Sequence, residues 1–202
     1  MQPYPVPAQS VEISEEIKKS RFITLLEPTA GIEAAKAFIQ RIKSLHPSAR
    51  HHCWAFVAGP PNDSQQLGFS DDGEPAGTAG KPILGQLMGS GIGEITAVVV
   101  RYYGGIKLGT GGLVRAYGNG VQLALAQLTV LEKVPQAEFL LQCDYAQISM
   151  IETLLQQVGG SILESKYGTA VDLRLTLPAY DAAEITNRLF NLSRGSLVLQ
   201  PV

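Results

Sequence analysis

Apolar residues recur at two periods along the second half of the chain, and these periods predict a regular series of strands and helices. Over 169–178 every second residue from Val171 to Leu177 is apolar, which predicts a strand with one buried face. Helical spacing over 146–158 predicts a helix that ends at Gly159. The other predicted elements are strands over 138–145, 161–168 and 195–202 and a helix over 181–192. This order, β-α-β-β-α-β, is that of a ferredoxin-like unit.

The first half of the chain mixes helices and strands in a less regular order. Apolar residues from Ile32 to Ile42 fall on one face of a predicted helix over 31–47. A nearly continuous apolar run over 95–103 is typical of a buried strand. The other predicted elements are one or two strands over 11–28, a strand over 49–59 and helices over 83–91 and 111–131. The mixture predicts an α+β fold.

Two domains are predicted, because the 202 residues are enough for two small domains and Pro135 interrupts a helical pattern. The boundary falls at 133–137, which gives a first domain of residues 1–135 and a second domain of residues 136–202.

The composition indicates a globular protein and disfavours several other classes of protein. Hydrophobic residues make up 45% and charged residues 17%, as in globular proteins, and the net charge of -2 excludes a strong overall basic field. The two cysteines, Cys53 and Cys143, lie far apart in different apolar contexts, and they form neither a disulfide framework nor the spacing of a metal motif. The N-terminus does not resemble a signal peptide, and no apolar run approaches the roughly 18 residues of a membrane span. We therefore expect a cytoplasmic protein with no membrane partner.

The stretch VVVRYYGGIKLGTGGLVRAYG joins the buried strand to a helix and carries three cations. Bare glycine backbone at the start of a helix exposes N–H donors, and the helix dipole favours an anion there. A phosphate group is therefore the expected ligand of this glycine-rich corner. The candidate binding residues are Arg101, Tyr103, Gly104, Gly105, Lys107, Gly109, Gly111, Gly112 and Arg115.

An architectural reading of the corner stays open, because glycines also allow a helix to pack closely against a sheet. The spacing from Gly104 to Gly109 matches a Walker A loop, but Thr110 stands where that motif needs lysine. Tyr102 and Tyr103 alternate at the strand end, so only one of them is expected to face a ligand.

Asp71, Asp72 and Glu74 form an acidic turn, and Lys81 follows it. Ion pairing with the cationic corner is favoured over a magnesium site, so no metal ligand is assigned, but all four residues are included among the candidate binding residues. His51 and His52 are consecutive on a predicted strand, so their side chains point to opposite faces. Cys53 lacks an evident activating neighbour, which disfavours a Cys–His nucleophile.

SDDGEPAGTAGKPIL followed by VVVRYYGGIKLGTGGLVRAY closely resembles the motifs of the IMPACT family, and KKSRFI and HHCWAF match its strands. The resemblance covers essentially the whole chain. It implies that residues 1–135 form the IMPACT N-terminal domain, similar to the second domain of small-subunit ribosomal protein five. It also implies a ferredoxin-like C-terminal domain, and both folds often contact RNA. Eukaryotic members of the family resemble translational regulators.

The leading functional hypothesis is a nucleic-acid- or ribosome-binding protein involved in regulation of translation. Arg101, Lys107 and Arg115 would contact phosphates, and a tyrosine would stack on an unpaired base. The alternative is an enzyme that binds a phosphorylated small molecule or a nucleotide at the same corner, and a protein partner is a third possibility. The residues leave open whether a reaction is catalysed, and no cofactor is expected.

Overall fold

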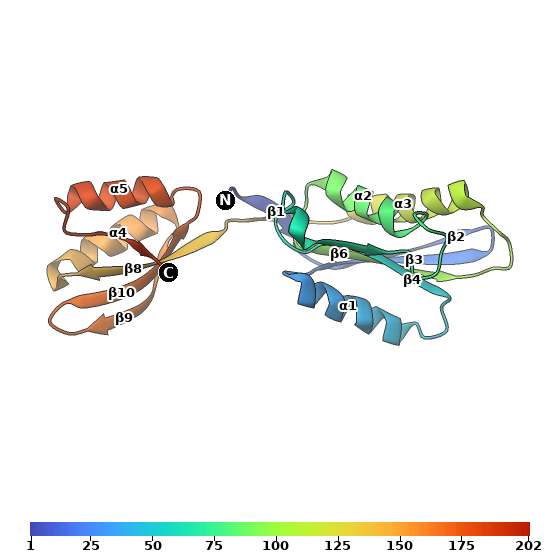
Figure 1. Ribbon diagram of the computed structural model, residues 1–202, viewed down its shortest axis with the longest axis horizontal. Coiled ribbons are helices and arrows are strands. Elements are labelled where there is room, and N and C mark those ends of the chain that lie inside the picture. The colour runs from blue at the N-terminus through green and yellow to red at the C-terminus, as the bar shows by residue number, and fades with distance from the viewer. The chain divides into compact units, whose positions relative to one another are not determined.

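A computed structural model describes all 202 residues, and the chain divides into two compact units. One unit comprises Tyr4–Glu132, and the other comprises Lys133–Val202 with Met1–Pro3. Each combines a β-sheet with helices (Figure 1), which confirms the predicted α+β class.

The unit Tyr4–Glu132 is built on a five-stranded sheet in which every pair of neighbouring strands is antiparallel. The segment predicted as one or two strands forms two, joined by a tight turn at Lys18 and Lys19, whose φ angles are 48° and 64°. In spatial order the strands are β2 (Val11–Ile17), β3 (Ser20–Pro28), β6 (Ile95–Tyr102), β4 (His51–Val57) and β5 (Leu67–Ser70).

Helices cover both faces of this sheet. Helix α1 (Ile32–Leu45) lies on one face, and α2 (Gly80–Ser90) and α3 (Thr110–Ala126) lie on the other (Figure 1). The central strand β6 is therefore buried on both faces, which explains its continuous apolar run. Alternate residues of β6 enter different cores: Val99 packs with α2 and α3, whereas Val98 and Val100 pack with α1.

In this unit, two helix boundaries differ from the sequence-based expectations. Helix α2 begins at Gly80, earlier than expected, and α3 ends at Ala126 rather than continuing to residue 131. The β-branched Thr129 and Val130 favour extended backbone, and Val130–Lys133 forms strand β7, which pairs with β1 (Tyr4–Pro7). Strand β5, preceded by the short 3₁₀ helix η1 (Ser64–Gln66), was not among the predicted elements.

The second unit has the predicted order of elements. Its strands form an antiparallel sheet in the order β11-β8-β10-β9, with both helices on one face (Figure 1). The predicted alternation is confirmed, because Val171, Leu173, Leu175 and Leu177 are all buried. The elements are β8 (Gln136–Cys143), η2 (Tyr145–Gln147), α4 (Ile148–Val158), β9 (Ser161–Tyr167), β10 (Val171–Pro178), α5 (Ala182–Leu192) and β11 (Gln200–Pro201).

The last strand is much shorter than the expected 195–202. Only Gln200–Pro201 pairs with β8. The residues before it form no strand, but Leu197 and Leu199 are buried in the core beneath the helices. Alternate residues of this segment are therefore buried as in a strand, although most of the backbone pairing of a strand is absent.

Candidate ligand-binding pocket

A cavity of about 440 Å³ lies where the acidic turn meets the glycine-rich corner. We name it the corner pocket. Its lining residues come from the start of β4, from the turn before α2, from the end of β6, and from the segment that continues from β6 through the first turn of α3. They are Arg50, His51, Gly73, Glu74, Pro75, Arg101, Tyr103, Lys107, Leu108, Gly109, Thr110 and Leu113.

Arg101 lines the corner pocket, but its side chain is buried rather than exposed. It is 5% exposed, and its Nη1 donates to Oε1 of Glu74 at 2.6 Å. Its Nη2 donates to Ser20 Oγ at 3.3 Å, and its guanidinium lies over the ring of Phe22. The predicted pairing of the acidic turn with the cationic corner is present as this buried ion pair. The charge of Arg101 is therefore compensated within the protein.

Glu74 uses its two carboxylate oxygens differently. The side chain is only 4% exposed, and Oε1 accepts hydrogen bonds from Arg101 and from the Tyr117 hydroxyl, the latter at 2.7 Å. Oε2 accepts no hydrogen bond, and Nε2 of His51 lies 3.9 Å from it. The only fully buried side-chain nitrogen or oxygen without a hydrogen-bond partner is Arg101 Nε, so Oε2 of Glu74 retains some contact with solvent, and Glu74 lines the pocket.

His51 is held in one orientation by the turn beside it. Its Nδ1 lies 2.8 Å from the backbone carbonyl oxygen of Asp72. A carbonyl oxygen can only accept, so Nδ1 carries a hydrogen, and in the neutral ring the lone pair is on Nε2. Asp72 has a φ of 41° and Gly73 a φ of 88°, which lets the chain turn back toward the ring. With the His51 ring neutral, the corner pocket therefore contains two acceptors, Nε2 and Oε2.

The exposed part of the corner pocket is cationic and aromatic. Tyr103 is 39% exposed, and the guanidinium groups of Arg50 and Arg101 lie 5.6 Å and 5.4 Å from its ring centre. Lys107 is exposed in the loop that follows, and α3 begins after Gly109 without a side-chain cap. Free N–H groups at a helix start favour an anion. This side of the pocket can therefore bind a negatively charged group.

Tyr102 and Tyr103 face different environments, as their alternation predicts. Tyr103 lines the corner pocket, whereas Tyr102 packs against the core beneath α1, and its hydroxyl lies 2.8 Å from Nδ1 of His46.

The three carboxylates of the acidic turn do not converge. Asp71 accepts backbone N–H groups at the start of α2, Asp72 contacts Lys43 and the backbone of His52, and Glu74 contacts Arg101. No group of three or more His, Cys, Asp or Glu side chains is arranged to hold a metal ion.

Five of the candidate residues from the sequence lie together in the corner pocket: Glu74, Arg101, Tyr103, Lys107 and Gly109. The others do not line it, and they are Asp71, Asp72, Lys81, Gly104, Gly105, Gly111, Gly112 and Arg115. Sequence reasoning did not assign Arg50 or His51 to this site. His51 is the register partner of Arg101 in the β4–β6 pair, and the backbone N–H of the preceding Arg50 donates to the Arg101 carbonyl oxygen, so the register of that pair is the signal that would have found both residues.

Comparison with known proteins identifies the family. Residues 18–125 match the Impact N-terminal domain, and residues 141–196 match a domain of unknown function, DUF1949. The IMPACT family member YigZ of Escherichia coli (strain K12) is 63% identical over 98% of both chains. This chain belongs to the IMPACT family.

Other relatives agree with this assignment. The IMPACT family member YvyE of Bacillus subtilis (strain 168) is 36% identical over 90% of this chain and 86% of its own length. A crystal structure of a protein described as hypothetical is 62% identical and covers 100% of this chain and 98% of its own, with a TM-score of 0.76. No helix of this IMPACT family protein combines the length and hydropathy needed to cross a membrane.

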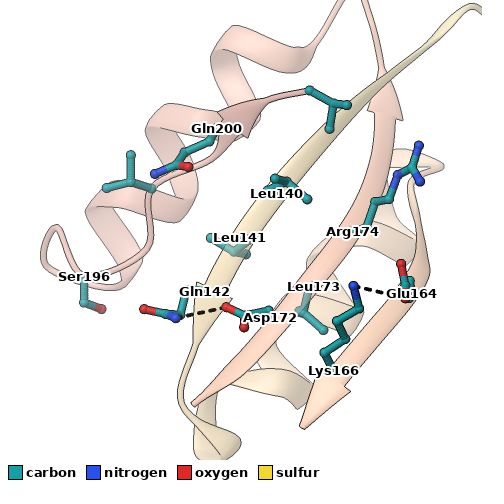
Figure 2. A pocket seen from close by; sticks show the side chains of 12 residues that line it. Leu140, Leu141, Gln142, Glu164, Lys166, Asp172, Leu173, Arg174, Ser196 and Gln200 are labelled. Atoms are coloured by element: carbon teal, nitrogen blue, oxygen red, sulfur yellow. Dashed lines mark hydrogen bonds and ion pairs between the residues drawn. The ribbon is translucent and has the colours of Figure 1, made fainter. Parts of the chain in front are cut away.

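A larger hollow of about 790 Å³ lies on the helix-free face of the second sheet (Figure 2). Its charged side chains are paired with one another or with close neighbours. Lys166 lies 3.5 Å from Glu164, and Gln142 donates to Asp172 at 2.9 Å. Arg174 forms an ion pair with Glu138 beside the hollow. Because little charge is left uncompensated, this hollow indicates no particular ligand.

The two cysteines are structural thiols in this IMPACT family protein. Both are free and buried. Burial raises the pKa of Cys53, whose Sγ donates to the carbonyl oxygen of Asp71, and burial also raises the pKa of Cys143. A thiol that stays protonated is a poor nucleophile, so the geometry does not support a Cys53–His51 catalytic pair.

Replacing Asp71 with asparagine should lower the free energy of unfolding by about 1–3 kcal/mol at pH 7. Although burial acts to raise the pKa of Asp71, hydrogen bonds from the backbone of Gly77, Gly80 and Ala79 and the charge of Lys81 lower it overall. A lowered folded-state pKa gives stability that is complete above the unfolded pKa, about 3.9, and is lost as the pH falls through the folded value.

Urea unfolding at pH 7 and pH 3 checks this prediction. The D71N variant should lose less stability between the two pH values than the wild type, because residue 71 no longer titrates. Equal losses in both proteins would contradict the assigned role of the carboxylate.

Proposed function

We propose that this IMPACT family protein binds single-stranded RNA, free or within the ribosome, at the corner pocket, and that it acts in the regulation of translation. The observation that carries the proposal is the convergence of exposed cations, an uncapped helix start and a half-exposed tyrosine on one cavity. The translational role rests on the family resemblance, as do the likeness of the first unit to the second domain of small-subunit ribosomal protein five and the ferredoxin-like fold of the second unit.

Phosphate contacts would come from the exposed side of the corner pocket. Lys107 and Arg50 are exposed, and the first N–H groups of α3 follow Gly109. Arg101 would instead position Tyr103 and Glu74, because its own charge is compensated. This revises the expectation that Arg101 contacts phosphate. The lining carries three cations against one carboxylate, so the pocket favours an anion although the whole chain is at -2.

A base would stack on the surface made by Tyr103 and Arg50. Unpaired bases commonly stack on aromatic rings and on the planes of arginine guanidinium groups. Arg50 already lies over the Tyr103 ring, and it is exposed, so it can extend the ring as a stacking surface. Residues 1–135 have a net charge of only +1, which favours a short contact with a few nucleotides over a long basic footprint.

An enzyme that acts on a nucleotide or another phosphorylated small molecule is the second candidate function. The pocket volume of about 440 Å³ falls within the roughly 300–1,000 Å³ typical of small-molecule sites, and Nε2 of a neutral His51 can accept a proton there. Chemical change of the bound nucleotide, followed by chromatography, would separate this candidate from simple binding.

Replacing Lys107 with alanine should weaken binding to a short single-stranded RNA about tenfold at low salt, the effect of losing one charge-assisted contact. The slope of log affinity against log salt should become shallower by about 0.7, the value for one phosphate on a single strand. Fluorescence anisotropy with a 5′-labelled RNA measures both quantities.

Lys36→Ala is the matched control, because it removes the same charge from the exposed surface of α1. Its affinity should equal that of the wild type. Absence of RNA binding by the wild type, or equal weakening by both substitutions, would overturn the proposal.

A further inference from the structure

We call the part of the corner pocket formed by Glu74 and His51 its floor. With His51 neutral, the floor holds two hydrogen-bond acceptors that accept no hydrogen bond from the protein. Oε2 of Glu74 belongs to a side chain that is 4% exposed, yet it accepts no hydrogen bond. Nε2 of His51 is 3.9 Å away, and its lone pair is fixed by the hydrogen bond that Nδ1 makes to the Asp72 carbonyl. The separation is too long for a direct hydrogen bond. Both atoms are therefore available to a ligand that carries donors.

The rest of the pocket defines what such a ligand must also carry. On the exposed side, Lys107 and the start of α3 favour an anion, and Tyr103 with Arg50 favours a flat ring. The floor favours a ligand with two adjacent hydrogen-bond donors, one for Oε2 of Glu74 and one for Nε2 of His51. A ribonucleotide satisfies all three requirements, because its phosphate, its base and the 2′- and 3′-hydroxyls of its ribose are separate groups. Carboxylates bind ribose hydroxyls in other nucleotide sites.

We propose that Glu74 and His51 bind the free 2′,3′-diol of a 5′-phosphorylated ribonucleoside unit, a specificity that rests on the RNA binding proposed above. The diol is found at the 3′ end of an RNA chain and in free nucleotides, and deoxyribose lacks it. An internal nucleotide of RNA has its 3′-oxygen esterified, so it offers one donor where the floor holds two acceptors. The site therefore distinguishes RNA from DNA and a chain end from a chain interior.

Ligand variation on the wild-type protein tests the proposal without disturbing the fold. Four 5′-labelled RNAs of one sequence are compared by fluorescence anisotropy: unmodified, 2′-deoxy at the 3′-terminal nucleotide, 3′-phosphorylated, and 2′-deoxy at an internal nucleotide. The two terminal changes should each weaken binding about tenfold, as expected for a lost hydrogen bond to a charged group, and the internal change should have no effect. Competition with a free 5′-mononucleotide then distinguishes a chain end from a small molecule as the preferred source.

A protein variant gives an independent readout. His51→Ala should reduce the preference for the unmodified 3′ end over its 2′-deoxy form, whereas His46→Ala, which alters a histidine bonded to Tyr102 rather than one lining the corner pocket, should preserve it. Equal affinity of the wild type for all four RNAs would overturn the diol proposal and leave RNA binding intact. Failure of all four RNAs to bind would instead overturn the proposed function.

Discussion

Replacing Glu74 with alanine is expected to lower the free energy of unfolding of the unit Tyr4–Glu132 by about 3–5 kcal/mol. The substitution removes the carboxylate that compensates Arg101, which is 5% exposed, and also leaves the buried Tyr117 hydroxyl without its acceptor. A buried charge without a partner keeps its full desolvation cost. Trp54, the only tryptophan of the chain, lies on β4 of this unit, so its fluorescence during urea unfolding reports the change.

Two further variants separate the ion pair from general effects of losing a glutamate. Glu33→Ala removes a carboxylate that is 88% exposed, and it should change stability by no more than about 0.5 kcal/mol. The double variant Glu74→Leu with Arg101→Met removes both charges, and it should recover much of the loss. A loss below about 1 kcal/mol for Glu74→Ala, or no recovery in the double variant, would show that the pair is not the dominant contact.

The spacing of apolar residues along the chain predicted most of the fold. Each buried helix or strand packs one or both of its faces against apolar neighbours, and this burial sets the spacing. The alternation of β10 and the apolar run of β6 both correspond to the observed burial. The elements that were missed share a different property. Strands β1, β5 and β7 are each four residues long and mostly lack buried side chains, so their sequences carry no clear period.

The candidate site was only partly predictable, because its parts come from segments far apart in the chain. Local composition was enough to pair the acidic turn with the cationic corner, which became the contact between Glu74 and Arg101. Local composition could not indicate that Arg101 would be buried, nor that Arg50 and His51 would lie beside it. Those facts depend on the pairing of β4 with β6 and on the packing around Phe22.

Local composition also could not distinguish the roles of the glycines in the glycine-rich corner. They lie close together in the sequence, but their structural roles differ. Gly105 and Gly109 have φ angles of 87° and 76°, so these glycines allow the backbone to adopt a left-handed conformation. A Cβ on Gly104 would lie 1.9 Å from the carbonyl oxygen of Lys19, in the β2–β3 turn. Gly104 therefore permits a close backbone approach, and the architectural reading of the corner holds for this residue.

Gly104→Ala is accordingly expected to lower the free energy of unfolding by about 3 kcal/mol or more, at the upper end of overpacking substitutions. The obstructing atom belongs to the backbone, so no change of rotamer can relieve the overlap, and the β2–β3 turn must move. The turn is already constrained, since Lys18 and Lys19 both have positive φ angles and Ser20 is hydrogen-bonded to the Gly104 N–H. Urea unfolding followed by Trp54 fluorescence measures the loss.

Gly105→Ala is the matched control, one residue further along the same loop. Its Cβ would meet nothing within 4 Å, so its cost should be only that of a left-handed alanine, about 1–2 kcal/mol. The difference between the two variants isolates the steric contact from the loss of glycine. If Gly105→Ala were the more destabilising of the two, backbone conformation rather than close approach would explain why this corner is rich in glycine.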